Sequence, residues 1–152
     1  TVGMTNSITD RYLGYLKSMM EHGMDVPEDY VMDDRDTKTG RMDLEKYYKF
    51  PKDMPTAFVC NNDEIACILI EKLEKMGYRV PEDISVTGFD NYPFIRRNAS
   101  GLTTVDVDIA MMASEGVELL LERLNEKRET FVRRVVSGHI VIRESTGRVA
   151  EP

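Results

Sequence analysis

The sequence predicts an α/β fold: a doubly wound, mostly parallel sheet with helices on both faces. Short apolar strands alternate with amphipathic helices along its 152 residues. The same helix-to-strand connection also occurs twice, as 21–31 and as 75–85; in each copy a helix ends at a glycine and Val-Pro-Glu-Asp leads into a strand. Glycine permits the left-handed helix cap and proline prevents the helix from continuing. Two such copies indicate successive βα units and therefore parallel strands. The chain is too short for the eight units of a barrel.

Helices are expected over 8–22, over 39–48 more weakly, from Asp63 to Gly77, and over 109–126. Asp63 is the expected N-cap of the third helix, and its inward face is expected to comprise Ile65, Ala66, Leu69, Leu73 and Met76. Strands are expected over 30–32, 57–60, 84–89 and 102–105, followed by a β-rich segment over 132–142 that is interrupted near Gly138. The continuous apolar run 57–60 predicts a strand covered on both faces. The stretch 91–101 has the composition of a loop.

Composition favours one soluble globular domain, because 41% of the residues are hydrophobic and 31% are charged. No apolar run is long enough to span a bilayer and no signal-peptide pattern opens the sequence. The opening Thr1-Val2-Gly3-Met4 reads as the end of a strand, so we expect a fragment of a longer protein. A formal charge of −7 argues against nucleic-acid binding by this chain itself. Cys60 and Cys67 are expected to be reduced thiols in a core, which suits the cytoplasm.

Polar side chains follow every expected strand. The groups in chain order are Thr5-Asn6-Ser7, Asp33 to Asp36, Asn61-Asn62-Asp63 and Asp90-Asn91. Ligands of open α/β sheets bind beyond the carboxyl ends of the strands, and such carboxylate, amide and hydroxyl groups can hydrogen-bond a polyol from several directions. Each residue could equally cap a helix or build a turn, and for Asp63 we favour the cap.

The sequence contains no recognisable catalytic constellation. His22 and His139 have no nucleophile or metal partner at a known spacing, and the nucleophile elbow, the P-loop and the dinucleotide-binding glycine motif are all missing. The acidic cluster Asp33, Asp34 and Asp36 could chelate a divalent cation or form a solvated turn, and we favour the turn. We therefore expect a binding protein without cofactor or metal, not an enzyme.

Several segments together resemble one protein family. The segments Pro55 to Ala66, Val80 to Asn91, Leu102 to Val105 and Ile142 to Thr146 are similar to signature segments of LacI/GalR-type bacterial transcription regulators. The resemblance implies the two-lobed fold of type I periplasmic sugar-binding proteins, preceded in those regulators by a helix-turn-helix headpiece that this chain lacks. It places 1–101 and 130–152 mainly in the carboxyl-terminal lobe and lets 102–129 contribute to the amino-terminal lobe.

The resemblance also implies six ligand-binding residues. Thr5 and Ser7 match effector contacts of the first loop, Arg11 matches an arginine that clamps hydroxyls or carboxylates, and Asn62 and Asp90 match two further contacts. Arg35 departs from the pattern, because family members often stack an aromatic ring there. Together, Arg11 and Arg35 lead us to expect an effector with anionic character, such as a sugar acid or sugar phosphate, although Asp90 points toward hydroxyl recognition.

The implied function is the sensing of a sugar or sugar derivative, coupled allosterically to operator binding. The implied partners are a second copy of the chain, the effector, and operator DNA contacted only through the headpiece; no membrane is involved. Two rivals stay open: a periplasmic sugar-binding protein of an ABC transporter, and a small metal-dependent α/β enzyme that uses Asp90 or the acidic cluster.

Overall fold

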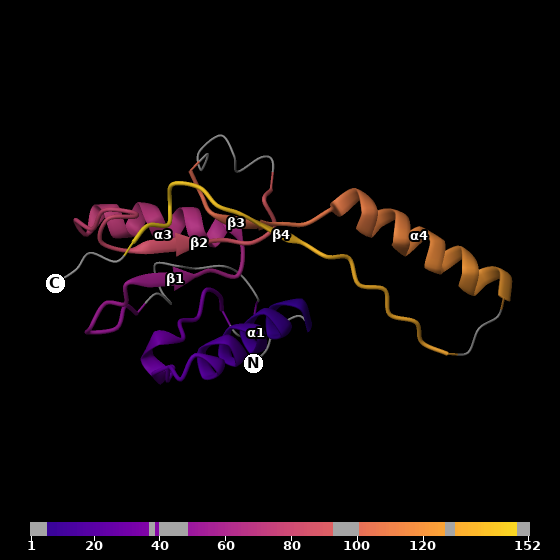
Figure 1. Cartoon of the computed structure of the whole chain (residues 1–152), viewed down its shortest axis with the longest axis horizontal. Helices are drawn as coiled ribbons and strands as arrows, with labels where there is room; N and C mark the ends of the chain where they lie inside the picture. The colour runs from indigo at the N-terminus through magenta and orange to yellow at the C-terminus, as the bar shows by residue number, and fades with distance from the viewer. Residues whose placement is uncertain (1–5, 37–38, 40–48, 93–100, 127–129, 149–152) are drawn as a thin grey trace.

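The computed structural model describes residues 6–36, 39, 49–92, 101–126 and 130–148 (Figure 1). Its elements follow in the order α1 (Asn6–Glu21), the 3-10 helix η1 (Glu28–Tyr30), β1 (Ala57–Val59), α3 (Asp63–Lys75), β2 (Ser85–Thr87), β3 (Thr104–Asp106), α4 (Ile109–Glu126) and β4 (His139–Val141). Helices therefore alternate with strands, as the periodicity predicts. The weak helix expected over 39–48 and most of the expected loop 91–101 lie outside the described residues.

The sheet is mostly parallel. β1 pairs in parallel with β2, with Phe58 opposite Val86. Beyond β2 the chain continues beside β3 through two parallel bridges, Thr87 to Thr103 and Asp90 to Asp106. β4 then pairs with β3 in the antiparallel direction. The resulting order β1–β2–β3–β4 agrees with the parallel sheet expected from the repeated βα connection, except for its last strand.

α1 and α3 lie on opposite sides of β1 (Figure 1), as a doubly wound fold requires. The inward face of α3 is buried as predicted, since Ile65, Ala66, Leu69 and Leu73 are each at most 2% exposed. They form one core with Phe58, Ile84, Val86 and Leu102. Met76 was expected to face inward but is 50% exposed, because α3 ends at Lys75.

Both predicted glycine caps are present. Gly23 and Gly77 have φ angles of 67° and 93°, in the left-handed region that favours glycine. The next residue closes the same bond each time: the amide of Met24 donates to the Met19 carbonyl at 2.9 Å and the amide of Tyr78 to the Leu73 carbonyl at 3.0 Å. The two helix ends are therefore built alike.

Two expectations about the strands are wrong. The segment predicted as a strand over 30–32 instead ends η1, because Glu28–Tyr30 forms a 3-10 turn and Val31 and Met32 do not pair with a strand. β1 is not covered on both faces either, since Val59 is 66% exposed. Both differences occur on the same side of the molecule, at the edge of the sheet formed by β1.

The last third of the chain extends away from the sheet. α4 occupies the predicted range, but it stands apart from the other layers and is joined to them by β3 and by the segment before β4 (Figure 1). Arg134 attaches that segment to α4 through Glu115 (2.6 Å), Glu118 (3.1 Å) and Glu122 (2.5 Å). β3 begins two residues later than expected, and β4 is the one strand within the β-rich stretch 132–142. Among the described helices, none is long and apolar enough to cross a membrane.

Candidate functional site: a polar rim at the carboxyl ends of the strands

The carboxyl ends of β1 and β2 meet at one edge of the sheet, where α1 also begins. We call the polar side chains gathered there the rim; its members are Arg11, Asp34, Arg35, Asn61, Asn62 and Asp90. Ligands of open α/β sheets bind in this position. Four of the six residues expected as ligand contacts therefore lie in one place. Ser7 lies in the first turn of α1 and is exposed, and Thr5 lies outside the described residues.

Arg11 connects α1 to the ends of both strands. Its Nη1 donates to the carbonyl oxygen of Asn61 at 2.6 Å, and its Nη2 lies 3.4 Å from Oδ1 of Asp90. Its Cζ atom lies 3.8 Å from the centroid of the Phe89 ring, which is within range of a cation–π contact. Its buried Nε–H has no hydrogen-bond partner within the described part of the chain. Arg11 is thus fixed in place and still holds a donor for a ligand oxygen.

Asp90 sits in a strained backbone conformation. Its φ angle is 105°, which a residue with a Cβ rarely adopts, and the following Asn91 has a φ of 49°. The amide of Asp90 donates to the carbonyl of Val105 at 3.0 Å, so the strained turn is held against β3. Strain of this kind costs about 1–3 kcal/mol and clusters at ligand sites. It favours Asp90 as a functional residue.

The pKa of the Asp90 carboxyl is raised, first because burial disfavours its charge and further because Asp63 is nearby, whereas Arg11 opposes the shift. The side chain is nevertheless 40% exposed, so one face remains accessible. A partly desolvated carboxylate of this kind gains more than an exposed one from a hydroxyl that donates to it.

Asn91 ties the same turn to the chain on either side of α4. Its Nδ2 donates to Oδ1 of Asp106 at the end of β3. Its Oδ1 accepts from Nη2 of Arg143 at 2.8 Å, just after β4. Arg143 also donates from Nη1 to the carbonyl of Leu102 at 2.7 Å. The turn that carries Asp90 is therefore bonded to both segments that run to and from α4.

Arg35 forms a two-pronged ion pair with its neighbour Asp34, from Nε to Oδ1 at 2.6 Å and from Nη2 to Oδ2 at 3.0 Å. Nδ2 of Asn61 adds a third hydrogen bond to Asp34 at 3.1 Å. Burial tends to raise the pKa of Asp34, but the hydrogen bonds from Arg35 and Asn61 outweigh it and the net pKa is lowered. The acidic cluster is thus partly a counter-ion for Arg35. No group of three or more His, Cys, Asp or Glu side chains among the described residues is placed to hold a metal ion.

Asn62, not Asp63, caps α3. Oδ1 of Asn62 accepts from the amide of Ile65 at 2.9 Å. Asp63, assigned to the cap from the sequence, is instead 4% exposed and accepts from the Thr104 hydroxyl at 2.5 Å and from the Tyr92 amide at 3.0 Å. Its carboxylate therefore binds α3 to β3 from inside the protein.

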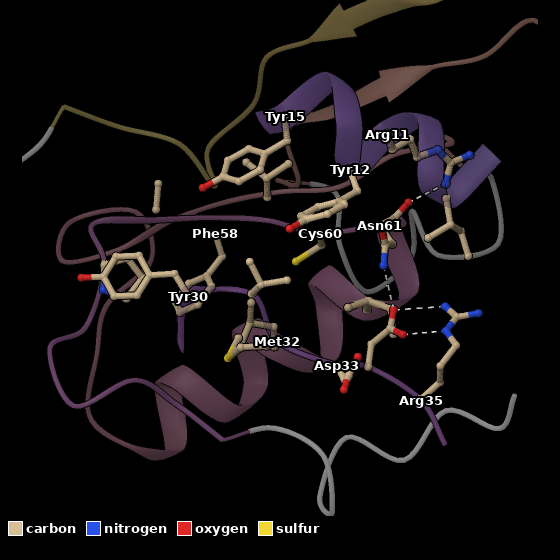
Figure 2. Close-up of a pocket in the computed structure, with 18 residues that line it drawn as sticks. Arg11, Tyr12, Tyr15, Tyr30, Met32, Asp33, Arg35, Phe58, Cys60 and Asn61 are labelled. Atoms are coloured by element: carbon tan, nitrogen blue, oxygen red, sulfur yellow. Dashed lines mark hydrogen bonds and ion pairs between the residues drawn. The ribbon is translucent and has the colours of Figure 1, made fainter. Parts of the chain in front are cut away.

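A cavity of about 390 Å³ adjoins the rim (Figure 2). Arg11, Asp34, Arg35 and Asn61 form its polar end, and the remainder lies between the inner face of α1 and β1. Asn62, Asp90 and Ser7 do not line it. Cys60 lies in its wall; burial raises the pKa of this thiol strongly, and that of Cys67 to about 11. Both cysteines are free thiols, as expected.

Sequence reasoning passed over two members of the rim. It chose Asn62 from the pair Asn61-Asn62 and interpreted Asp34 as part of a turn. A usable signal was present, because both residues belong to polar groups that follow expected strands. What the sequence did not show is that Asn61 bonds to Arg11 through its carbonyl and to Asp34 through its amide.

Comparison with known proteins decides the family. Residues 2–146 match the sequence profile of the periplasmic binding protein-like domain. The chain belongs to this family. It is 36% identical over 137 residues to the HTH-type transcriptional repressor PurR of Pasteurella multocida (strain Pm70), covering 89% of this chain and 40% of the relative. It is 28% identical over 145 residues to the arabinose metabolism transcriptional repressor of Geobacillus stearothermophilus, covering 92% and 40%.

The fold of this periplasmic binding protein-like domain is also that of solved regulators. The transcriptional regulator CelR in complex with cellobiose superposes with a TM-score of 0.72 at 24% identity, over 90% of this chain and 42% of that one. The resemblance to LacI-type regulators and the α/β fold expected from the sequence are thus confirmed. These relatives are transcriptional regulators, not enzymes. The chain spans about two fifths of the length of the curated relatives.

Proposed function

We propose that this chain forms most of the carboxyl-terminal lobe of the effector-sensing domain of a LacI-type DNA-binding regulator, and that the rim binds a small-molecule effector. The observation that carries the proposal is the position of Arg11, which holds the carbonyl of Asn61 and faces the carboxylate of Asp90 at the carboxyl ends of two parallel strands. The strained φ of Asp90 and the unpaired Nε of Arg11 support it. Thr5, Ser7, Arg35 and Asn62 complete the proposed contacts.

The charge balance of the rim favours a neutral polyol such as a sugar over an anion. The guanidinium of Arg35 is already paired with Asp34, and that of Arg11 lies beside Asp90. Each positive charge therefore has its own carboxylate, so an anionic effector would meet no net positive charge. This replaces the anionic effector expected from Arg11 and Arg35 alone. Paired guanidinium and carboxylate groups supply donors and acceptors side by side, which suits hydroxyls that do both.

The division into lobes is part of the same proposal. Residues 1–101 and 130–152 belong mainly to the carboxyl-terminal lobe, and 102–129 contribute to the other. α4 supports this division because its apolar stripe is open to solvent in the described structure; Val117, Leu120, Leu121 and Leu124 are each more than 50% exposed. A stripe of this kind on an amphipathic helix normally packs against another element.

The proposed mechanism is linkage between effector and operator. Effector bound at Asp90 presses on the turn that Asn91 bonds to Asp106 and Arg143, on the two segments that lead to and from α4. Its binding free energy can therefore favour one orientation of the lobes. We further propose a cytoplasmic homodimer whose operator contacts come from a part of the protein outside this chain.

A thermal-shift screen of the full-length protein tests the proposal. The panel comprises neutral sugars, their sugar acids, sugar phosphates and nucleobases, because a ligand that binds only the native state raises the melting temperature by mass action. We expect a neutral sugar to give the largest shift, and Arg11→Ala and Asp90→Ala to abolish it. A shift by divalent metal alone, with none from the panel, would favour the metal-dependent enzyme. A sugar that binds without changing affinity for DNA would favour the periplasmic transport protein.

A further inference from the structure

β1 has one paired edge and one open edge. On the paired side, the amide of Ser85 donates to the carbonyl of Thr56 and the amide of Cys60 donates to the carbonyl of Thr87, both at 2.9 Å. Backbone groups alternate between the two edges of a strand, so those of Ala57 and Val59 point away from β2. Within the described part of the chain, the backbone groups of these two residues have no hydrogen-bond partner. The sheet thus ends in an unpaired row of donors and acceptors, which is a template for another strand.

A groove runs along this open edge. It is the apolar part of the 390 Å³ cavity, bounded by Ile8, Tyr12 and Tyr15 of α1 on one side and by β1 on the other (Figure 2). Tyr30, Val31 and Met32 form its far wall. Val59, a β-branched residue suited to a sheet interior, is 66% exposed beside it. Arg11 ends the groove at its bond to the Asn61 carbonyl.

We propose that a β-strand parallel to β1 fills this groove, and that this strand is the segment leading into α1, namely Thr1-Val2-Gly3-Met4 with the residues ahead of it in the full-length protein. Those four residues lie outside the described part of the chain. In a doubly wound fold each helix follows a strand that it then covers, through a connection of only a few residues. α1 already covers the groove, and it begins at Asn6, two residues after Met4.

The proposed strand accounts for a failed expectation. With it in place, the strands in spatial order are the segment 31–34, the new strand, β1, β2 and β3. In chain order this is 2-1-3-4-5, one of the two common arrangements of doubly wound sheets. The segment 31–34 would then gain a neighbour and could extend as the strand that its sequence predicts. Without that neighbour, η1 leads into unpaired chain at Val31 and Met32.

A strand tethered to α1 is favoured over a strand from a second copy. The connection to Asn6 is so short that the tethered strand is held at a high effective concentration next to the groove. A second copy would have to insert an edge strand beneath α1, between Tyr12 and Val59. The inference does not depend on the effector, because the rim is built by Arg11, Asn61 and Asp90 whether or not the groove is filled.

Residue-resolved hydrogen–deuterium exchange on the full-length protein tests this inference within a single strand. Phe58 and Cys60 are internal controls, because their amides face β2. If the groove holds a strand, the amides of Ala57 and Val59 exchange as slowly as those of the controls, within about tenfold. Exchange of Ala57 and Val59 about a hundredfold faster than the controls would overturn the proposal. Protection that disappears on dilution would also overturn it, because it would assign the groove to a second copy.

Discussion

The guanidinium of Arg11 lies between the ring of Phe89 and the carboxylate of Asp90, with Cζ 3.8 Å from the ring centroid and Nη2 3.4 Å from Oδ1. Two consecutive residues at the end of β2 thus position one side chain of α1. The contact to the ring restricts the rotation of the guanidinium, and the carbonyl of Asn61 fixes its direction. This preorganisation lowers the entropic cost of binding a ligand at the rim.

Replacing Asp90 by asparagine is expected to stabilise the ligand-free protein slightly while weakening effector binding. Burial raises the pKa of Asp90, so its ionised form is less favourable in the folded state than in the unfolded chain. The charge therefore lowers stability above the ordinary carboxyl pKa of 3.8, and this penalty disappears as the pH falls below that value. Because the side chain is 40% exposed, the gain at pH 7 should not exceed about 0.5 kcal/mol. Thermal unfolding at pH 7 and pH 3 measures it; a lower melting temperature for Asp90→Asn at pH 7 would contradict the account.

Asp34→Asn should have the opposite effect on stability. The pKa of Asp34 is lowered by its bonds from Arg35 and Asn61, so its ionised form contributes stability above the ordinary pKa of 3.8. That contribution is lost as the pH falls through the lowered pKa of the folded state. We expect Asp34→Asn to cost about 1–3 kcal/mol at pH 7, because it leaves Arg35 without a counter-ion. Denaturant unfolding across pH 7 to 3 should show this difference shrinking, and a cost that is independent of pH would show that the charge is not involved.

The hydrogen bond between Thr104 and Asp63 predicts a large effect from a small change. Thr104→Val preserves the side-chain volume but removes the hydroxyl that donates to a buried carboxylate at 2.5 Å. Loss of a buried hydrogen bond to a charged group costs about 1.5–3 kcal/mol. The exposed Thr130 supplies the matched control, and Thr130→Val should change stability by less than about 0.5 kcal/mol. Equal effects of the two variants in denaturant unfolding would be incompatible with the role assigned to Asp63.

Gly88 must lack a side chain for Asp63 to lie where it does. A Cβ atom on Gly88 would collide with Oδ1 of Asp63 and would lie only 3.1 Å from the Cα of that residue. Gly88→Ala is therefore expected to destabilise the protein by about 1–3 kcal/mol or more. A Cβ atom on Gly14 in α1 would meet nothing within 4 Å, so Gly14→Ala should be neutral or stabilising. Melting temperatures of the two variants compare them directly, and tolerance of Gly88→Ala would show that the α3 to β3 contact can adjust.

The sequence predicted the elements whose signals are local. The apolar spacing of α3, the two glycine caps and the range of α4 all depend on residues within a few positions of one another. It failed where a distant partner decides. The choice between Asn62 and Asp63 as the cap depends on Thr104, which lies 41 residues away from Asp63 and draws its carboxylate inward. The segment 30–32 has strand composition but no neighbouring strand among the described residues.

The rim was predicted in outline, with its charges incorrectly balanced. Polar residues after each strand indicated where a ligand would bind, and Arg11 and Asp90 do lie together. The sequence did not reveal that Arg35 folds back onto its own neighbour Asp34, because side-chain direction at a strand end depends on the loop that follows. That single pairing changes the expected effector from an anion to a neutral polyol.

Isothermal titration calorimetry of the full-length protein tests the central claim most directly, with the sugar that gives the largest thermal shift as the titrant. The comparison is between Arg11→Ala, at the rim, and Arg79→Ala, a surface arginine paired with Asp83 at 2.6 Å. The account predicts that Arg11→Ala weakens binding at least about a hundredfold, equivalent to about 2.7 kcal/mol, while Arg79→Ala leaves the dissociation constant unchanged. Equal affinity of the wild type and Arg11→Ala would contradict the account, because the effector would then bind somewhere other than the rim.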